Sequence, residues 1–119
     1  MSYIDGFVLP LPKKNLKTYR NMAVKAAKIW RDHGALEVYE CVGDDLNHRH
    51  CLTFPKLAKV KSSETVIFSW IVYKSRSHRD KVNAKVMKDP RMNKIMENIE
   101  MPFDMKRMAY GGFKLLVKA

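Results

Sequence analysis

The residues whose types suit chemistry fall into three groups, and the first combines histidine with cysteine. His48, His50 and Cys51 lie within four residues, and Cys41 precedes them. Imidazole and thiolate groups are ligands that zinc and copper accept. Their spacing matches no common zinc framework, however, and an exposed loop accounts for the same residues. The sequence therefore predicts a polar loop here and no metal site.

The second group places a carboxylate and hydroxyl groups on predicted strands. Asp5 and Ser69 each stand in an otherwise apolar stretch. Because an unpaired buried carboxylate is costly, Asp5 should be paired, lie near water or hold a proton. One hypothesis is a pocket in which this acid relays protons, and the other is a structural ion pair with Arg107. The candidate pocket comprises Asp5, Ser69, Tyr73, Arg107 and Tyr110.

The third group lies in the region after residue 75, where helices are predicted. Arg79, Asn83 and Arg91 are candidates for binding an anionic ligand at a helix end. Helix capping and surface ion pairing explain the same residue types. Both interpretations stay open at this point.

Strands and helices alternate along the chain and must position these side chains. The first half of the chain is predicted to form a strand over 3–11, a helix that Gly34 ends, and a strand over 35–42. The apolar positions of this helix are 16, 19, 23, 26 and 30. A mobile polar loop over 46–64 is followed by a strand over 65–73, a helix from 75 or 77, a short helix from 90, and a strand over 106–117. Ser77 with Asp80 resembles a capping box, and Asp89-Pro90 is typical of a helix start. The short helix should carry Met92, Ile95, Met96 and Ile99. Gly111-Gly112 indicates a bulge or a close approach of another backbone.

The order βαββαβ predicts an α+β, ferredoxin-like fold. Right-handed crossovers place both helices on one face of a four-stranded antiparallel sheet. The strand over 65–73 is apolar on both faces, so the face without helices also needs a cover. We expect Phe7, Ile67 and Ile71 on that open face, and a homodimer that packs sheet to sheet.

The composition limits the classes of protein to which this chain can belong. A length of 119 residues with 46% hydrophobic content fits one domain over residues 1–119. No apolar run approaches the roughly 20 residues that span a bilayer, no secretory signal opens the chain, and two cysteines make no disulfide framework. We therefore expect a cytoplasmic protein.

A net charge of +11 raises the question of nucleic acid. Cations between residues 13 and 31 fall on one arc of the first predicted helix, which is typical of a solvated face or of a phosphate-binding surface. No nucleic-acid motif accompanies them. Nucleic-acid binding is therefore the least favoured function.

Four segments resemble the YbaA-like family of small bacterial proteins. They are Tyr3–Phe7, Phe68–Ile71, Asp89–Met92 and Pro102–Phe113. The resemblance implies a ferredoxin-like fold of the dimeric α/β-barrel type, and it implies no activity and no site residues. The loop over 46–64 departs from the family, because Asn47–Cys51 stands where a Pro-Asp-Gly-Lys-like turn is usual.

Two hypotheses about function remain. In the first, a sheet-lined cavity binds a small apolar or aromatic molecule, for metal-free oxygenation or isomerisation without a cofactor. In the second, the protein is a non-catalytic binding or assembly module. A cavity of about 300 Å³ or more with converging polar groups favours the first, and a closed core favours the second.

Overall fold

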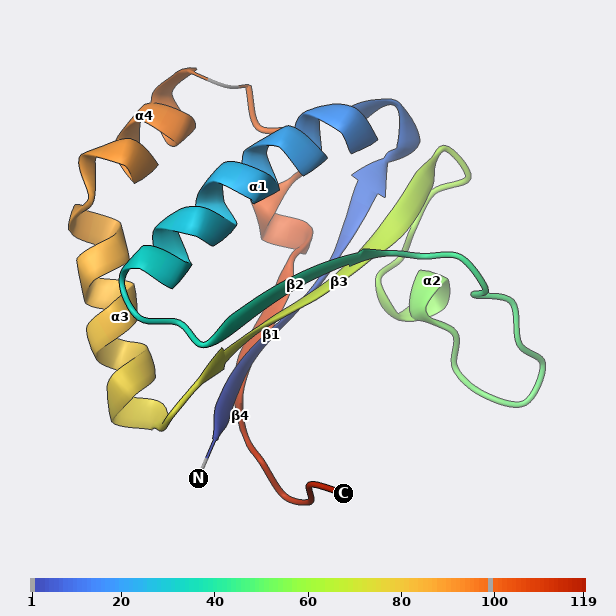
Figure 1. The fold of residues 1–119 in the computed structure, drawn as a ribbon. Helices are drawn as coiled ribbons and strands as arrows, with labels where there is room; N and C mark the ends of the chain where they lie inside the picture. The colour runs from blue at the N-terminus through green and yellow to red at the C-terminus, as the bar shows by residue number, and fades with distance from the viewer. Residues whose placement is uncertain (1, 99) are drawn as a thin grey trace.

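A computed structural model describes residues 2–98 and 100–119 of the chain. The elements are β1 (Tyr3–Pro12), the 3-10 turn η1 (Lys13–Asn15), α1 (Leu16–Asp32), β2 (Glu37–Val42), α2 (Phe54–Leu57), β3 (Glu64–Tyr73), α3 (Arg76–Lys88), α4 (Pro90–Asn98), the 3-10 turn η2 (Met105–Arg107) and β4 (Ala109–Lys114). The strands form one antiparallel sheet in the order β2-β3-β1-β4. Helices α1, α3 and α4 lie on one side of this sheet (Figure 1). The predicted α+β, ferredoxin-like fold is therefore confirmed.

Local signals set most helix ends. Gly34 follows α1 with a φ of 114°, a conformation that glycine adopts without strain. The oxygen of Ser75 accepts the backbone N–H of His78 at the start of α3, so the capping box predicted at Ser77 is wrong. Asp89 accepts the N–H of Arg91 at 2.8 Å and so caps α4, as predicted. Ile99, predicted on this short helix, lies outside the described residues.

The core lies between the sheet and the helices. Side chains from the sheet and from α1, α3 and α4 meet there, and they include Tyr3, Leu9, Tyr19, Ala23, Ile29, Ile67, Ile71, Tyr73, Val82, Val86, Met92 and Ile95. Ile67 is only 2% exposed and Ile71 only 6% exposed within this layer, and Phe7 packs against it. The expectation that these three residues face the open side is therefore wrong. Alternation divides a strand into two faces, but it does not say which face the helices cover.

The opposite face of the sheet is mostly apolar, and helices α1, α3 and α4 do not cover it. We call it the open face. Strand alternation and register place on it Ile4, Gly6, Val8, Glu37, Tyr39, Cys41, Val66, Phe68, Trp70, Val72, Ala109, Gly111 and Phe113. Ring centroids of Tyr39, Trp70, Phe68 and Phe54 follow one another at 4.9, 5.5 and 5.8 Å. Phe54 belongs to α2, so this short helix lies at one end of the open face.

Two segments differ from their predicted form. The connection over 46–64 contains α2, because Thr53 accepts the N–H of Lys56 and starts a helical turn. The last strand is shorter than predicted and contains no bulge, since Gly111 and Gly112 pair with Gly6 and Asp5 in unbroken register. A close approach does explain Gly112, but the approaching group is a side chain and not a backbone. A methyl group added at Gly112 would lie 2.8 Å from Cε2 of Tyr3.

An ion pair joins the first residue of β3 to η2. The guanidinium of Arg107 holds both oxygens of Glu64, at 2.7 and 3.0 Å, and donates to the carbonyl of Lys59. These hydrogen bonds lower the pKa of Glu64 from 4.5 to about 2. Because the folded-state pKa is depressed, the pair contributes stability above pH 4.5, and this contribution is lost as the pH falls toward 2.

Replacing Glu64 with glutamine should therefore lower the free energy of unfolding at pH 7, and the gap from the natural protein should narrow between pH 5 and pH 2. Urea titrations at several pH values measure this difference. Glu97→Gln, an exposed change on α4, serves as the matched control. A gap that stays constant down to pH 2 contradicts the assignment.

Candidate functional site

A cleft opens between α1 and the β2–β3 edge of the sheet. Its outer part has a volume of about 420 Å³. Its lining residues are Leu16, Tyr19, Arg20, Ala23, Val24, Ala27, Val38, Glu40, Cys41, Val42 and Ile67. Small side chains at Ala23 and Ala27 keep the helix from filling the space above the strands. We call this space, with its inner extension, the α1 cleft.

The inner extension of the α1 cleft reaches toward the middle of the sheet. It has a volume of about 170 Å³ and shares five lining residues with the outer part, namely Tyr19, Ala23, Ala27, Val38 and Glu40. Phe7, Trp30, Phe103 and Met108 are among the apolar and aromatic side chains that line only the extension. The cleft therefore offers a predominantly apolar surface, the usual character of a small-molecule site.

Three polar side chains converge on this apolar space. The hydroxyl of Tyr19 donates to Oε1 of Glu40 at 2.7 Å. Ser69 stands opposite Glu40 in the β2–β3 register and lines the inner extension. Glu40 lines both parts of the cleft and is an exposed residue of the edge strand β2.

The apolar surroundings shift the protonation of this pair. Burial raises the pKa of the Glu40 carboxyl above its usual range, and hydrogen bonds from Tyr19 and Ser69 only partly oppose that rise. Burial, reinforced by the charge of Glu40, holds the pKa of the Tyr19 phenol well above its usual range. Tyr19 therefore remains a hydrogen-bond donor at neutral pH.

Of the predicted pocket residues, Asp5, Tyr73 and Tyr110 are not among those that line the α1 cleft. Asp5, only 1% exposed, accepts a hydrogen bond from Nη1 of Arg79 at 2.6 Å, and the same nitrogen donates to the hydroxyl of Tyr110 at 2.9 Å. Tyr110 stacks on Phe7, which lines the inner extension. Asp5 is thus held in a structural ion pair that supports the cleft wall from behind.

The expectation that Arg107 partners Asp5 is wrong. Arg107 bonds Glu64, and it lines a separate cavity of about 340 Å³ with Val8, Leu57, Ala58, Lys59, Lys106 and Ala109. Ser69 is the one predicted pocket residue that lines the α1 cleft.

The three predicted anion-binding residues have separate partners. Arg79 pairs with Asp5, while Asn83 accepts hydrogen bonds from the hydroxyl of Tyr73 and from the indole of Trp30, both at 3.1 Å. Because Trp30 lines the inner extension, Asn83 fixes one cleft wall. The structure therefore gives Arg79 and Asn83 positioning contacts.

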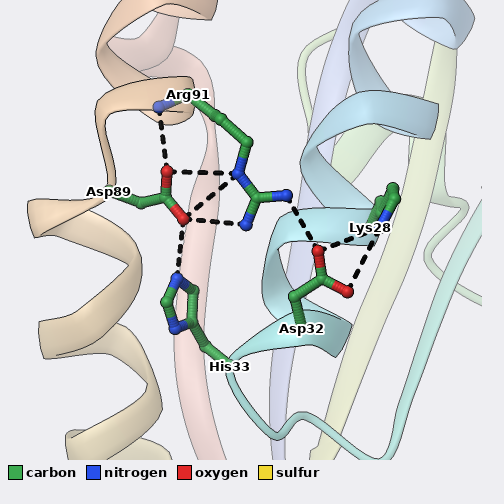
Figure 2. Close-up of polar contacts among 5 residues, drawn as sticks. All are labelled: Lys28, Asp32, His33, Asp89 and Arg91. Carbon is green, nitrogen blue, oxygen red and sulfur yellow. Dashed lines mark hydrogen bonds and ion pairs between the residues drawn. The ribbon is translucent and has the colours of Figure 1, made fainter.

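Arg91 belongs to a polar cluster between helix ends, and Figure 2 shows it reaching from the start of α4 toward α1. It lies 2.8 Å from Asp89 and 2.8 Å from Asp32, while His33 approaches Asp89 from the other side at 2.7 Å. Hydrogen bonds from Arg91 and His33 hold the pKa of Asp89 well below its usual range. The cluster ties the end of α1, which roofs the cleft, to the α3–α4 junction.

Of the histidine–cysteine group, Cys41 lines the outer part of the α1 cleft. His48 bonds the carbonyl of Asp45 at 3.1 Å, and Cys41 and Cys51 are both exposed and unbridged. Across the described ranges, no three His, Cys, Asp or Glu side chains gather as metal ligands would. None of the helices described there has the length and apolarity that a membrane span requires.

Sequence reasoning missed the two residues at the centre of the site. Tyr19 reads as part of the apolar stripe of α1, and Glu40 as a solvated residue on an edge strand. Alternation with Val38 and Val42 was the available signal, because it places Glu40 on the side of β2 that faces the helices.

Comparisons with known proteins agree with the fold. A family model described as "Protein of unknown function (DUF1428)" matches residues 2–105. The chain is 44% identical over 117 residues to the "Uncharacterized protein YbaA" of Escherichia coli (strain K12), covering 98% of each chain, and matches YbaA of Shigella flexneri to the same extent. The solved structure of Rv0793 from Mycobacterium tuberculosis aligns with a TM-score of 0.52 at 12% identity, covering 100% of this chain and 99% of that one, a likeness of fold alone.

Proposed function

Because the chain belongs to the DUF1428 family, whose description assigns no activity, we propose a function from the site itself: the protein binds a small apolar or aromatic molecule in the α1 cleft. The observation that carries this proposal is an apolar cleft of about 420 Å³ on which Glu40 and Tyr19 converge. Pockets that enclose small ligands measure roughly 300–1,000 Å³ and combine an apolar lining with a few placed polar groups.

The proposal predicts that blocking the cleft removes binding. Ala27 lines both parts of the cleft, so a leucine there projects into space that the ligand needs. We expect the natural protein to bind the neutral fluorescent probe N-phenyl-1-naphthylamine at one site, and Ala27→Leu to weaken binding by about tenfold or more, since each 1.4 kcal/mol is tenfold. A fluorescence titration measures both dissociation constants.

Ala84→Leu is the matched control, because Ala84 is an exposed alanine on α3. It should bind the probe as the natural protein does. Equal affinity of all three proteins would place the probe elsewhere and overturn the proposal. Since the new leucine fills empty space, Ala27→Leu should remain folded, which circular dichroism checks.

The open face supports a second proposal, that two copies pack sheet to sheet. Phe68 is 43% exposed and Phe113 60% exposed there, an apolar surface of the kind that marks an interface. None of the residues assigned to this face is a lysine or arginine, although the net charge is +11. Two copies therefore meet with least repulsion here, whereas the lysines of α1 oppose contact through the helices.

The partner proposed for this face is a second copy because identical faces match in size and none of the residues that the register places there is a lysine or arginine. Native mass spectrometry of the untagged protein reports the number of subunits. A monomer at micromolar concentration would contradict the proposal, and an unrelated bound protein would replace it.

A further inference from the structure

Glu40 differs from three buried carboxylates that are held in ion pairs. Asp5, Glu64 and Asp89 each lie within 2.8 Å of an arginine nitrogen. For Glu40, by contrast, no lysine, arginine or histidine nitrogen of the described residues lies within ion-pair distance. Glu40 is an exposed residue on the wall of a mostly apolar cleft, and its hydrogen-bond partners are the neutral hydroxyls of Tyr19 and Ser69.

A carboxylate in such surroundings favours a cationic partner. Coulomb attraction strengthens as water is excluded, so an amine that fills the apolar cleft and displaces water would gain from pairing with this carboxylate. Tyr19 occupies Oε1, and a carboxylate can accept further hydrogen bonds on its second oxygen. An ammonium group on a ligand would supply both the missing charge and the missing donor.

The lining of the cleft also restricts the rest of the ligand molecule, to which the ammonium group is attached. Phe7, Trp30 and Phe103 line the inner extension beyond Glu40, so the rest of the ligand meets aromatic and aliphatic carbon. Arg20, on the outer lining, is exposed and has a long side chain that can remain in solvent.

We propose, building on the proposed function, that the α1 cleft selects an apolar or aromatic molecule bearing one protonated amine, with the Glu40 carboxylate as its counter-ion. Tyr19 is a positioning residue for that carboxylate. Its hydroxyl and that of Ser69 hydrogen-bond the carboxyl, and a carboxylate has further acceptor positions for a ligand.

Three probes of similar size separate charge from shape: 2-phenylethylamine, which is protonated at pH 7, the neutral 2-phenylethanol, and the anion 3-phenylpropanoate. NMR titration of the full-length protein gives a dissociation constant for each. We expect the amine to bind about tenfold more tightly than the alcohol, since only the amine can form a charge-assisted hydrogen bond with the carboxylate. The anion should bind most weakly.

Glu40→Gln keeps the shape of the side chain and removes its charge. It should weaken amine binding about tenfold and leave alcohol binding within about twofold, since only the amine gains from the charge. Glu37→Gln is the matched control, because it removes the same charge from the opposite side of β2. It should leave the affinity for both probes unchanged.

Equal binding of amine and alcohol, or tightest binding of the anion, overturns the inference and leaves the proposed function intact. Failure of all three probes in protein that still binds N-phenyl-1-naphthylamine also overturns the inference alone. If that fluorescent probe fails as well, the proposed function fails with it.

Discussion

Replacing Arg79 with methionine is expected to lower the free energy of unfolding by about 3–5 kcal/mol, because it leaves a buried carboxylate without its counter-ion. Asp5 is 1% exposed and the Arg79 side chain 12% exposed, with 2.6 Å between Nη1 and Oδ1. Arg79 also lies 5.0 Å from the centre of the Tyr3 ring and donates to Tyr110. Urea denaturation at pH 7 and fixed protein concentration measures the loss.

Two further variants separate the ion pair from simple loss of packing. Arg76→Met removes an exposed arginine from the same helix and should change stability by no more than about 0.5 kcal/mol. Asp5→Leu combined with Arg79→Met should regain most of the loss, because no unpaired charge remains. If Arg79→Met costs less than about 1 kcal/mol, the carboxylate is not confined as the geometry indicates.

The partner of Asp5 is an example of a contact that the sequence alone does not predict. Burial of this residue, and its need for a partner, follow from one carboxylate in an apolar strand. The choice of Arg79 over Arg107 does not, since 74 positions separate the paired residues and only the path of α3 across the sheet brings them together. Local signals such as Gly34 and Asp89-Pro90 were predictable because their cause lies within a few residues.

The candidate site was predictable only in part for the same reason. Ser69 stands out because it interrupts the most apolar strand, and it does line the cleft. Glu40 and Tyr19 are each ordinary for their own element, an edge strand and an amphipathic helix. Their significance arises from the 2.7 Å contact across two elements, which no spacing along the chain encodes.

The second large effect concerns the open face, where Phe68→Glu is expected to weaken self-association by about 100-fold or more. Phe68 lies on the central strand β3, and its ring contacts both Trp70 and Phe54. In a sheet-to-sheet dimer, a glutamate at this position would be buried without a partner in both copies. Losses above 2 kcal/mol are typical when an aromatic residue at the centre of an interface is removed.

Sedimentation velocity over a concentration series measures the dissociation constant for each protein. Met87→Glu is the matched control, since Met87 is an exposed apolar residue of α3, 59% accessible, on the helical side of the sheet. It should leave association unchanged, which separates the position of the charge from the change in net charge. Because Phe68 is already 43% exposed in one copy, its replacement should leave a folded monomer. A Phe68→Glu protein that associates as tightly as the natural protein would place the interface on another surface, and the apolar open face would then need a different cover.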